Sequence, residues 1–330
     1  MNRSSRTYVI WWSTGTYITT AVQTVQGSLL VVTNLLLLVT LLYHKSLRRR
    51  KEYIVIIGVT LADFLFGTGM IRGSTLHLYR FYTGEAKYPS TRHDCFLTYH
   101  SFMYTFGMSA QGFMLVSQAI DRLLAIGLPV FYYGLQPSYA WLMVGVPFGL
   151  DMIQCMVLGY GSWNDNTLTP KRFTNCMPKN ALNPVLFKIW NGLHTACGYV
   201  SVLVFIVVMI LYKRHMENKV GDMASEQKKM HMRKQRKVTM SMAISCVFTM
   251  VFFVTPRIVN QLFMASSKSI KLSNLIAFNL YNVNPMLNLF IYLKRHREVR
   301  VGLMNAVVKQ EQLPFDLQSV SKAKHGGTLF

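Results

Sequence analysis

Long apolar segments alternate with short polar connections along most of this 330-residue chain. Each segment has at least the ~20 residues that an α-helix needs to cross a lipid bilayer. The segments fall at residues 20–43, 53–76, 96–120, 138–160, 187–212, 238–263 and 272–293. Because unpaired backbone groups are too costly in lipid, these segments must be helical. The pattern predicts an all-α membrane protein: a seven-helix bundle at 20–293, a short extracellular N-terminus at 1–19, and a cytoplasmic amphipathic helix and disordered tail at 294–330.

Composition and the placement of basic residues indicate the class and the orientation. Hydrophobic residues make up 51% of the chain and charged residues 15%, which excludes an ordinary soluble domain. Lysine and arginine are about twice as frequent in the tail and in the connections after the first, third and fifth segments as on the other side. We therefore expect a multi-pass plasma-membrane protein with its N-terminus outside and its C-terminus in the cytoplasm. Anionic membrane lipids then match the net charge of +22, and no nucleic-acid partner is needed to explain it.

The five cysteines fall into two groups. Cys95 and Cys176 lie in predicted outer connections, where an oxidising compartment allows a disulfide to form. The other cysteines lie within predicted helices, where they are expected to act as small apolar fillers: Cys155, Cys197 and Cys246. No metal-ligand cluster, phosphate-binding loop or nucleophile–base arrangement appears, so we do not expect an enzyme or a cofactor.

Several short motifs lie at matching places in the predicted helices. The third helix ends in Asp121-Arg122-Leu123, followed by Pro129, the first contains Asn34, and the second contains Asp63. With Cys95 and Cys176, these residues resemble the rhodopsin-like G protein-coupled receptors over about residues 34–302. The resemblance implies a disulfide between the two cysteines, an extracellular small-molecule or peptide ligand, and a heterotrimeric G protein as the partner.

Two alignments compete for the family's Asn-Pro-x-x-Tyr element in the seventh helix. Asn288–Tyr292 keeps the Asn and the Tyr but has Leu289 where the family has Pro. Asn284–Asn288 keeps Pro285 and loses the Tyr. We prefer the first alignment because it also preserves the distance to the basic amphipathic segment that follows.

Departures from the family pattern narrow the resemblance. Leu123 stands in the aromatic place after Arg122, Leu289 replaces proline, and Val254 replaces a tryptophan before Pro256. With the short N-terminus, these features resemble the nematode serpentine chemoreceptors of the SRSX group. Tyr104 occupies the place of the aspartate of amine receptors, and Asn282 that of the retinal-binding lysine of opsins. An amine ligand and retinal are therefore not expected.

Asp63 lies at mid-depth of the second helix, where an ionised carboxylate costs several kcal/mol unless it is paired or hydrated. In the family this aspartate marks a sodium site. The residues that would line it here are Asn34, Gln111, Asn284 and Asn288. The alternative is a carboxyl group whose hydrogen bonds these same amides satisfy, with no ion.

The outer halves of the second and sixth helices carry Arg72 and Arg257. An arginine at this depth can pair with an anionic ligand group, such as a small acid or a peptide carboxylate. The alternatives are structural pairing with Asp151 or extension of the Arg72 side chain to the interface. The candidate ligand-contacting residues are Tyr104, Met108, Arg257, Asn260, Gln261 and Arg72.

The resemblance also implies a switch at the cytoplasmic end of the bundle. Arg122 would pair with Asp121 at rest and contact the G protein when the sixth helix swings outward about Pro256, with Tyr292 at the same end. The inner end of the sixth helix, residues 233–237, is basic and carries no acid, so a resting ion pair across to this helix is not expected.

We expect a chemosensory receptor that couples to a G protein. A neuropeptide receptor of the same fold is one alternative, because Arg257 would suit a peptide carboxylate. A transporter or channel is the alternative from another class, but the sequence shows no internal repeat.

Overall fold

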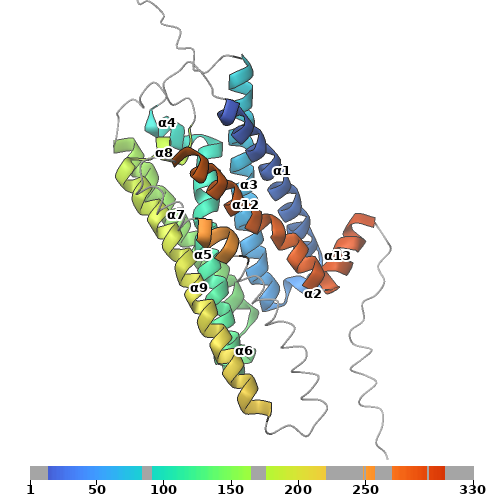
Figure 1. Cartoon of the computed structure of the whole chain (residues 1–330). Coiled ribbons are helices and arrows are strands. Elements are labelled where there is room, and N and C mark those ends of the chain that lie inside the picture. The colour runs from blue at the N-terminus through green and yellow to red at the C-terminus, as the bar shows by residue number, and fades with distance from the viewer. Residues whose placement is uncertain are drawn as a thin grey trace, which may run out of the picture.

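The computed structural model describes residues 14–83, 91–164, 176–220, 248, 250–256, 270–295 and 297–308. Helices make up the regular elements of this part of the chain (Figure 1). The long helices are α1 (Thr14–Tyr43), α3 (Lys51–Thr83), α5 (Tyr99–Gly127), α7 (Pro137–Asn164), α9 (Pro184–Val220) and α12 (Ile270–Arg295). The shorter elements are α2 (Lys45–Arg48), α4 (Arg92–Leu97), α6 (Pro129–Gly134), α8 (Pro178–Ala181), α13 (Arg297–Val308) and a π-helical segment, η1 (Met250–Val254).

Six of the seven predicted apolar segments coincide with these long helices. Within the described residues, four spans are long and apolar enough to cross a membrane: Tyr17–Tyr43, Lys51–Tyr79, Pro137–Asn164 and Pro184–Arg214. The predicted helix at 238–263 lies largely outside the described residues, which include only 248 and 250–256 of it.

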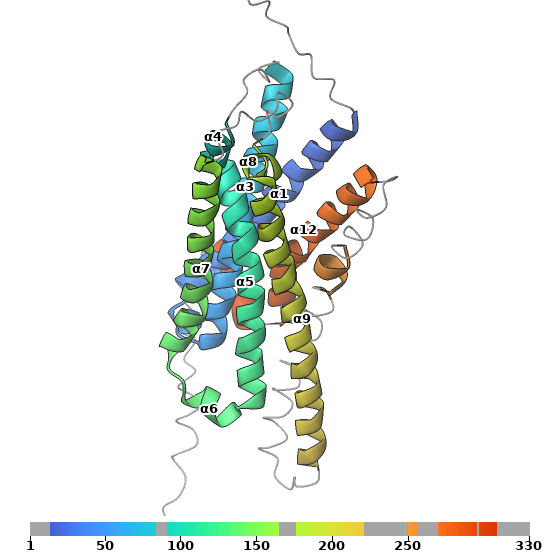
Figure 2. The same cartoon turned by 90° about the vertical axis from the view of Figure 1, so that its left-hand side faces the viewer.

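The long helices run roughly along one direction and form a bundle (Figures 1 and 2). Helix α3 packs between α1 and α5, and α5 also packs against α7 and α9, so α5 lies at the centre of the described part. Helices α4 and α8 lie at one end, called here the disulfide end, and α2, α6 and α13 lie at the other, called the Asp121 end.

Helix α7 shows how these helices divide their surface between protein and lipid. It is apolar nearly all round, so its sequence does not mark an inner face. Its buried residues nevertheless recur every three or four positions: Ala140, Val144, Pro147, Asp151, Cys155, Leu158 and Ser162. The intervening residues include exposed Leu150, Ile153 and Val157, as expected for side chains that face hydrocarbon.

Helices α3 and α5 approach each other unusually closely at two glycines. A Cβ atom at Gly69 would lie 2.7 Å from the Cα of Tyr104, and a Cβ atom at Gly107 would lie 2.6 Å from the Cα of Phe66. Each glycine thus packs directly against the backbone of the opposite helix. Small residues at helix contacts allow this in membranes, where dispersion contacts replace the hydrophobic effect as the main attraction between helices.

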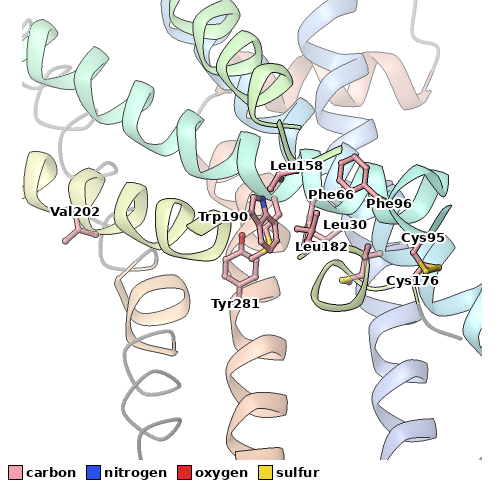
Figure 3. Close-up of a cluster of buried hydrophobic side chains, with 13 residues drawn as sticks. Leu30, Phe66, Cys95, Phe96, Leu158, Cys176, Leu182, Trp190, Val202 and Tyr281 are labelled. Carbon is pink, nitrogen blue, oxygen red and sulfur yellow. A yellow bond between two sulfur atoms is a disulfide. The ribbon is translucent and has the colours of Figure 1, made fainter. Parts of the chain in front are cut away.

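A buried apolar cluster extends from the disulfide end into the bundle. Figure 3 shows it running from the Cys95–Cys176 disulfide, past Phe66 and Trp190, to Val202 of α9. Cys95 belongs to α4 and Cys176 precedes α8, so the disulfide ties the connection after α7 to the start of α5. This disulfide confirms the predicted pairing. Among the described cysteines, Cys155 and Cys197 are free thiols, as expected.

Candidate signalling site and ligand cavity

The predicted switch residues lie where α5 ends and the chain turns back. Helix α5 stops at Gly127 because Leu128 leaves the helical conformation, with φ −130° and ψ 62°. Pro129 then opens α6, since its fixed φ suits the first turn of a helix. This short helix brings Tyr132 back to the end of α5.

Asp121, Arg122 and Tyr132 form a buried polar cluster. Arg122 Nε lies 3.4 Å from Asp121 Oδ2, and the Asp121 side chain has no exposed surface. The Tyr132 hydroxyl donates a hydrogen bond to Asp121 Oδ1, with 3.2 Å between the oxygens. Burial, followed by the nearby Asp121 carboxylate, raises the pKa of the Tyr132 hydroxyl above its ordinary value. The hydroxyl therefore stays protonated and remains a donor to Asp121.

Lys51 fixes α6 to the start of α3. Its ammonium group donates to the Tyr132 carbonyl oxygen at 2.6 Å and lies 4.9 Å from the centre of the Tyr132 ring. Such a cation over an aromatic ring adds attraction to the hydrogen bond. Tyr132 is thus held through its backbone, its ring and its hydroxyl.

A second polar cluster lies deep in the bundle around Asp63, which is buried. The Gln111 side-chain amide donates to Asp63 Oδ1 at 2.8 Å, and the Asn288 amide donates to Asp63 Oδ2 at 2.8 Å. Each carboxylate oxygen therefore accepts one N–H bond, which reduces the cost of its burial. Three of the helices, α3, α5 and α12, meet at this carboxyl group.

The cluster continues towards α9. The Tyr281 hydroxyl on α12 donates to Gln111 Oε1 at 2.6 Å and lies 3.4 Å from His194 Nε2 on α9. The hydrogen-bonded chain therefore joins His194, Tyr281, Gln111, Asp63 and Asn288 across four helices. Breaking any link would leave a buried polar atom without its partner.

The structure brings together some of the predicted ion-site residues and not others. Gln111 and Asn288 contact Asp63, as described. The Asn34 amide instead donates to the Leu30 carbonyl of its own helix at 2.9 Å. The Asn284 side chain lies outside the described residues.

The other predicted switch residues occupy the sixth and seventh helices. Tyr292 is buried at the Asp121 end, in a cluster with Tyr53, Ile57 and Leu289. Pro256 is buried shortly after the π-helical segment η1. The Thr255 hydroxyl, between them, donates to the carbonyl of Met250 in η1 at 2.8 Å. The basic segment 233–237 lies outside the described residues.

Asp151 is buried on α7 beside Ser109 of α5. The Trp190 indole N–H of α9 donates to the Ser109 hydroxyl at 2.6 Å. The weak contact between the Cys155 thiol and Asp151 measures 4.0 Å. Arg72 is exposed on α3. The contacts described for Asp151 are with Ser109 and Cys155 and not with Arg72.

A cavity lies at the disulfide end between α1, α3 and α5, covered by the segment 176–178. Its enclosed part is small, about 10 Å³, which is room for about one water molecule, and the rest opens to the outside. Its walls come from Gln23 of α1, Gly69, Met70 and Gly73 of α3, and His100, Ser101 and Tyr104 of α5. Gly73 faces His100 here, since a Cβ atom at Gly73 would lie 3.3 Å from His100 Cδ2.

The predicted ligand-contacting residues are only partly gathered here. Tyr104 lines the cavity, whereas Met108 is buried in the apolar cluster one turn further along α5. Arg72 is exposed and is absent from the lining. Arg257, Asn260 and Gln261 lie outside the described residues.

Sequence reasoning missed several residues that the structure places in these sites. Tyr132 could have been suspected from its position in a short loop that starts with Pro129, shortly after Asp121. For His194, Tyr281 and Trp190, the only signal was a polar or aromatic group within an apolar segment. That signal does not show which helix the group faces.

The chain was compared with curated proteins and with models of protein families, and only a family model matches. Comparison with curated proteins found no significant match. The family model for the serpentine type 7TM GPCR chemoreceptor Srsx matches residues 28–306, a range that includes α3, α5, α7, α9 and α12 with both polar clusters and the disulfide. That agreement with the bundle described above shows that the chain is a seven-helix membrane protein and belongs to the Srsx family of serpentine G protein-coupled chemoreceptors.

Proposed function

We propose that this chemoreceptor binds an extracellular ligand and responds by activating a heterotrimeric G protein. Its N-terminus would lie outside the plasma membrane and the Asp121 end would face the cytoplasm, as the distribution of basic residues predicts. The Asp121–Arg122–Tyr132 cluster carries the proposal, because an ion pair at one end of a helix bundle is a group that a conformational change can open.

The mechanism requires two arrangements of Arg122. In the arrangement described here, Asp121 and the Tyr132 hydroxyl form a buried network with the guanidinium group close by. Outward movement of the sixth helix would expose Arg122 to the transducer. A ligand drives this change only if it binds the second arrangement more tightly than the first.

The chain of hydrogen bonds from His194 to Asn288 supports a route between the two ends. Its Gln111 lies on α5, the helix that also carries Asp121 and Arg122, but nearer to the disulfide end. From there the chain of hydrogen bonds reaches α12 and α9. A shift of α12 would have to break or rearrange the bond between Asn288 and Asp63. The same bond favours the alignment that assigns Asn288–Tyr292 to the family's Asn-Pro-x-x-Tyr element.

The sodium ion near Asp63 stays a prediction. Two N–H donors already contact the Asp63 carboxylate, so a cation would bind the remaining lone pairs. Gln111 Oε1 accepts from Tyr281 and is already engaged. These contacts fit an amide-satisfied carboxyl group better than a ready set of oxygen ligands, so the mechanism proposed here uses no ion.

The test is second-messenger output, calcium and cyclic nucleotide, in cells that express the receptor. Wild type and Arg122→Ala would be challenged with pooled small acids, volatile compounds and peptides. We expect Arg122→Ala to abolish the response at equal surface density. Arg49→Ala removes an exposed arginine at the same end and serves as the matched control, with a normal response expected.

Two further measurements separate a coupling defect from misfolding. Surface delivery would be measured for each variant with an antibody against an N-terminal tag. Arg122→Lys keeps the charge and removes the planar guanidinium group, so it tests whether the ion pair alone is enough. An undiminished response in Arg122→Ala would refute the proposed switch.

A further inference from the structure

A basic surface lies at the Asp121 end, where the apolar span of α1 stops. This span ends at Tyr43, whose exposed ring is of the kind that lies at the membrane–water interface. Helix α2 begins shortly afterwards, at Lys45. Residues 45–51 contain five basic residues and no acidic residue. These cations therefore lie at the level of the lipid headgroups.

One buried apolar cluster holds three elements together at this place. Leu47 of α2, Tyr292 of α12 and Val299 of α13 all belong to it. The residues that follow Leu47 and Val299 in the sequence, Arg48 and Arg300, are exposed. Successive residues point about 100° apart around a helix, so each arginine extends from the rim of the same buried cluster.

A hydrogen bond and a glycine fix α13 against this end of α1. The His44 ring donates from Nε2 to the Gly302 carbonyl oxygen at 3.1 Å. A Cβ atom at Gly302 would lie 2.7 Å from His44 Cδ2 and 3.2 Å from Thr40 Cγ2, so a larger residue there would push α13 away. Figure 1 shows α2 and α13 beside the same end of α1, which both of them contact. The basic residues of the two short helices are thus held on one surface.

Four exposed basic residues belong to these three elements: Lys45, Arg48, Lys294 and Arg300. Lys45 and Arg48 lie three positions apart on α2, so they share one side of it. Among the described residues, no carboxylate forms a salt bridge with any of the four. Like charges gathered in this way repel one another, and an anion that contacts several of them relieves the repulsion.

The depth and the charge of this surface indicate the chemistry of its partner. Val39 and Leu42 of α1 are exposed shortly before the basic residues, so acyl chains can lie against them while a headgroup contacts the cations. A phosphatidylserine headgroup has a single net negative charge, whereas a phosphorylated inositol headgroup has several on one ring. Arginine binds phosphate oxygens through paired N–H donors. A phosphoinositide therefore fits the gathered cations better than a singly charged lipid.

We propose that α2, α13 and the end of α12 form a binding site for one phosphoinositide, whose phosphates contact Lys45, Arg48 and Arg300. The inference rests on the proposed orientation, in which the Asp121 end faces the cytoplasm, because anionic inositol lipids belong to the cytoplasmic leaflet. Lipid binding is not a step of the proposed signalling, and the site does not include Asp121, Arg122 or Tyr132.

The experiment measures lipid binding to the purified full-length receptor by native mass spectrometry, which resolves how many lipid molecules are bound. The probes are dioctanoyl phosphatidylinositol bisphosphate, dioctanoyl phosphatidylserine, and inositol trisphosphate, which is a free headgroup without acyl chains. We expect one bisphosphate lipid to bind at least ~10-fold more tightly than either other probe. Phosphatidylserine carries too little charge, and the free headgroup has no chains to lie against α1.

The variants test which residues form the site. Lys45→Gln/Arg48→Gln should weaken binding about 25-fold, since each basic residue near an anionic lipid contributes about fivefold. Lys213→Gln/Arg214→Gln is the matched control, because it removes two exposed basic residues from the end of α9, which Figure 1 shows well apart from α13. This control should leave the affinity unchanged. Gly302→Leu keeps every charge but displaces α13 from α1, so it should also weaken binding.

Each outcome bears on this site alone. Selective binding of the bisphosphate lipid that is lost in Lys45→Gln/Arg48→Gln supports the site whether or not Arg122→Ala abolishes signalling. Equal binding of phosphatidylserine or of inositol trisphosphate, or an equal loss in the α9 control, would each overturn the inference. Unchanged binding in the α2 variant would also overturn it. If that variant cannot be purified, Arg300→Gln tests the α13 half, where about fivefold weaker binding is expected and an unchanged affinity contradicts the site.

Discussion

Replacing Gly107 by alanine tests the close packing of α3 against α5. The new Cβ atom would lie 2.6 Å from the Cα of Phe66 on the other helix. Carbon atoms in favourable contact lie about 3.5–4.0 Å apart, so the two backbones would have to separate by at least ~0.9 Å. Backbone atoms cannot rotate out of the way as the end of a flexible side chain can.

The expected cost follows from this geometry. Overpacking a well-packed site costs typically ~1–3 kcal/mol, and the rigid contact with Phe66 places Gly107→Ala at the upper end. A loss of 3 kcal/mol lowers the ratio of folded to unfolded receptor about 150-fold. The opposing gain in helix propensity from Gly to Ala is about 1 kcal/mol and does not offset it.

The assay is the melting temperature of the detergent-solubilised receptor together with its surface density in cells. Gly149→Ala is the matched control, because a Cβ atom there meets nothing within 4 Å and the helix gains propensity. We expect Gly107→Ala to melt several degrees lower than wild type and Gly149→Ala to melt at the same temperature or slightly higher. Equal melting temperatures for the two variants would refute the packing argument.

Three other predictions follow from the polar contacts and the disulfide. Tyr132→Phe removes the hydrogen bond to Asp121, which is worth about 1.5–3 kcal/mol for a charged acceptor. Basal second-messenger output should therefore rise about tenfold. The control is Tyr133→Phe at an exposed tyrosine, and equal basal output in the two variants would contradict the role of this hydrogen bond. Asp63→Asn turns an N–H group towards the donors of Gln111 or Asn288, so the melting temperature should fall by the equivalent of about 1–3 kcal/mol, and an unchanged value would count against this contact. Cys176→Ser opens a cross-link between residues 81 apart, which stabilises by about 2–4 kcal/mol, and should reduce surface delivery relative to Cys197→Ser; full delivery would show that the disulfide is dispensable.

The positions of Asp121 and Arg122 were easier to predict from the sequence than their contacts. Asp121 and Arg122 could be placed at the end of the third helix because the apolar segment stops near them. The contact with Tyr132 could not be predicted, since it depends on the break at Leu128 and on the direction of the helix that follows. Lys51 joins this cluster from a different helix, which no local pattern indicates.

The ion-site residues show the same division. Gln111 and Asn288 meet Asp63 as the family resemblance implied, because their positions along each helix match in depth. Asn34 lies at a matching place in the sequence but bonds to its own helix. Whether an amide side chain faces Asp63 depends on how its helix is rotated about its own axis. The pattern of apolar segments does not predict that rotation.

The sequence by itself determined the helical class and the positions of the described long helices, because backbone hydrogen bonding in lipid leaves no other choice for a segment of about twenty apolar residues. Its motifs indicated the family by resemblance, and that resemblance implied the disulfide partners. Only the tertiary structure decided which faces of these helices meet. Apolar residues surround α7 almost completely, and lipid offers no hydrophobic preference for one side. The pairing therefore depends on atoms far apart in the sequence, such as Gly107 against Phe66, and on polar groups that must find partners across helices.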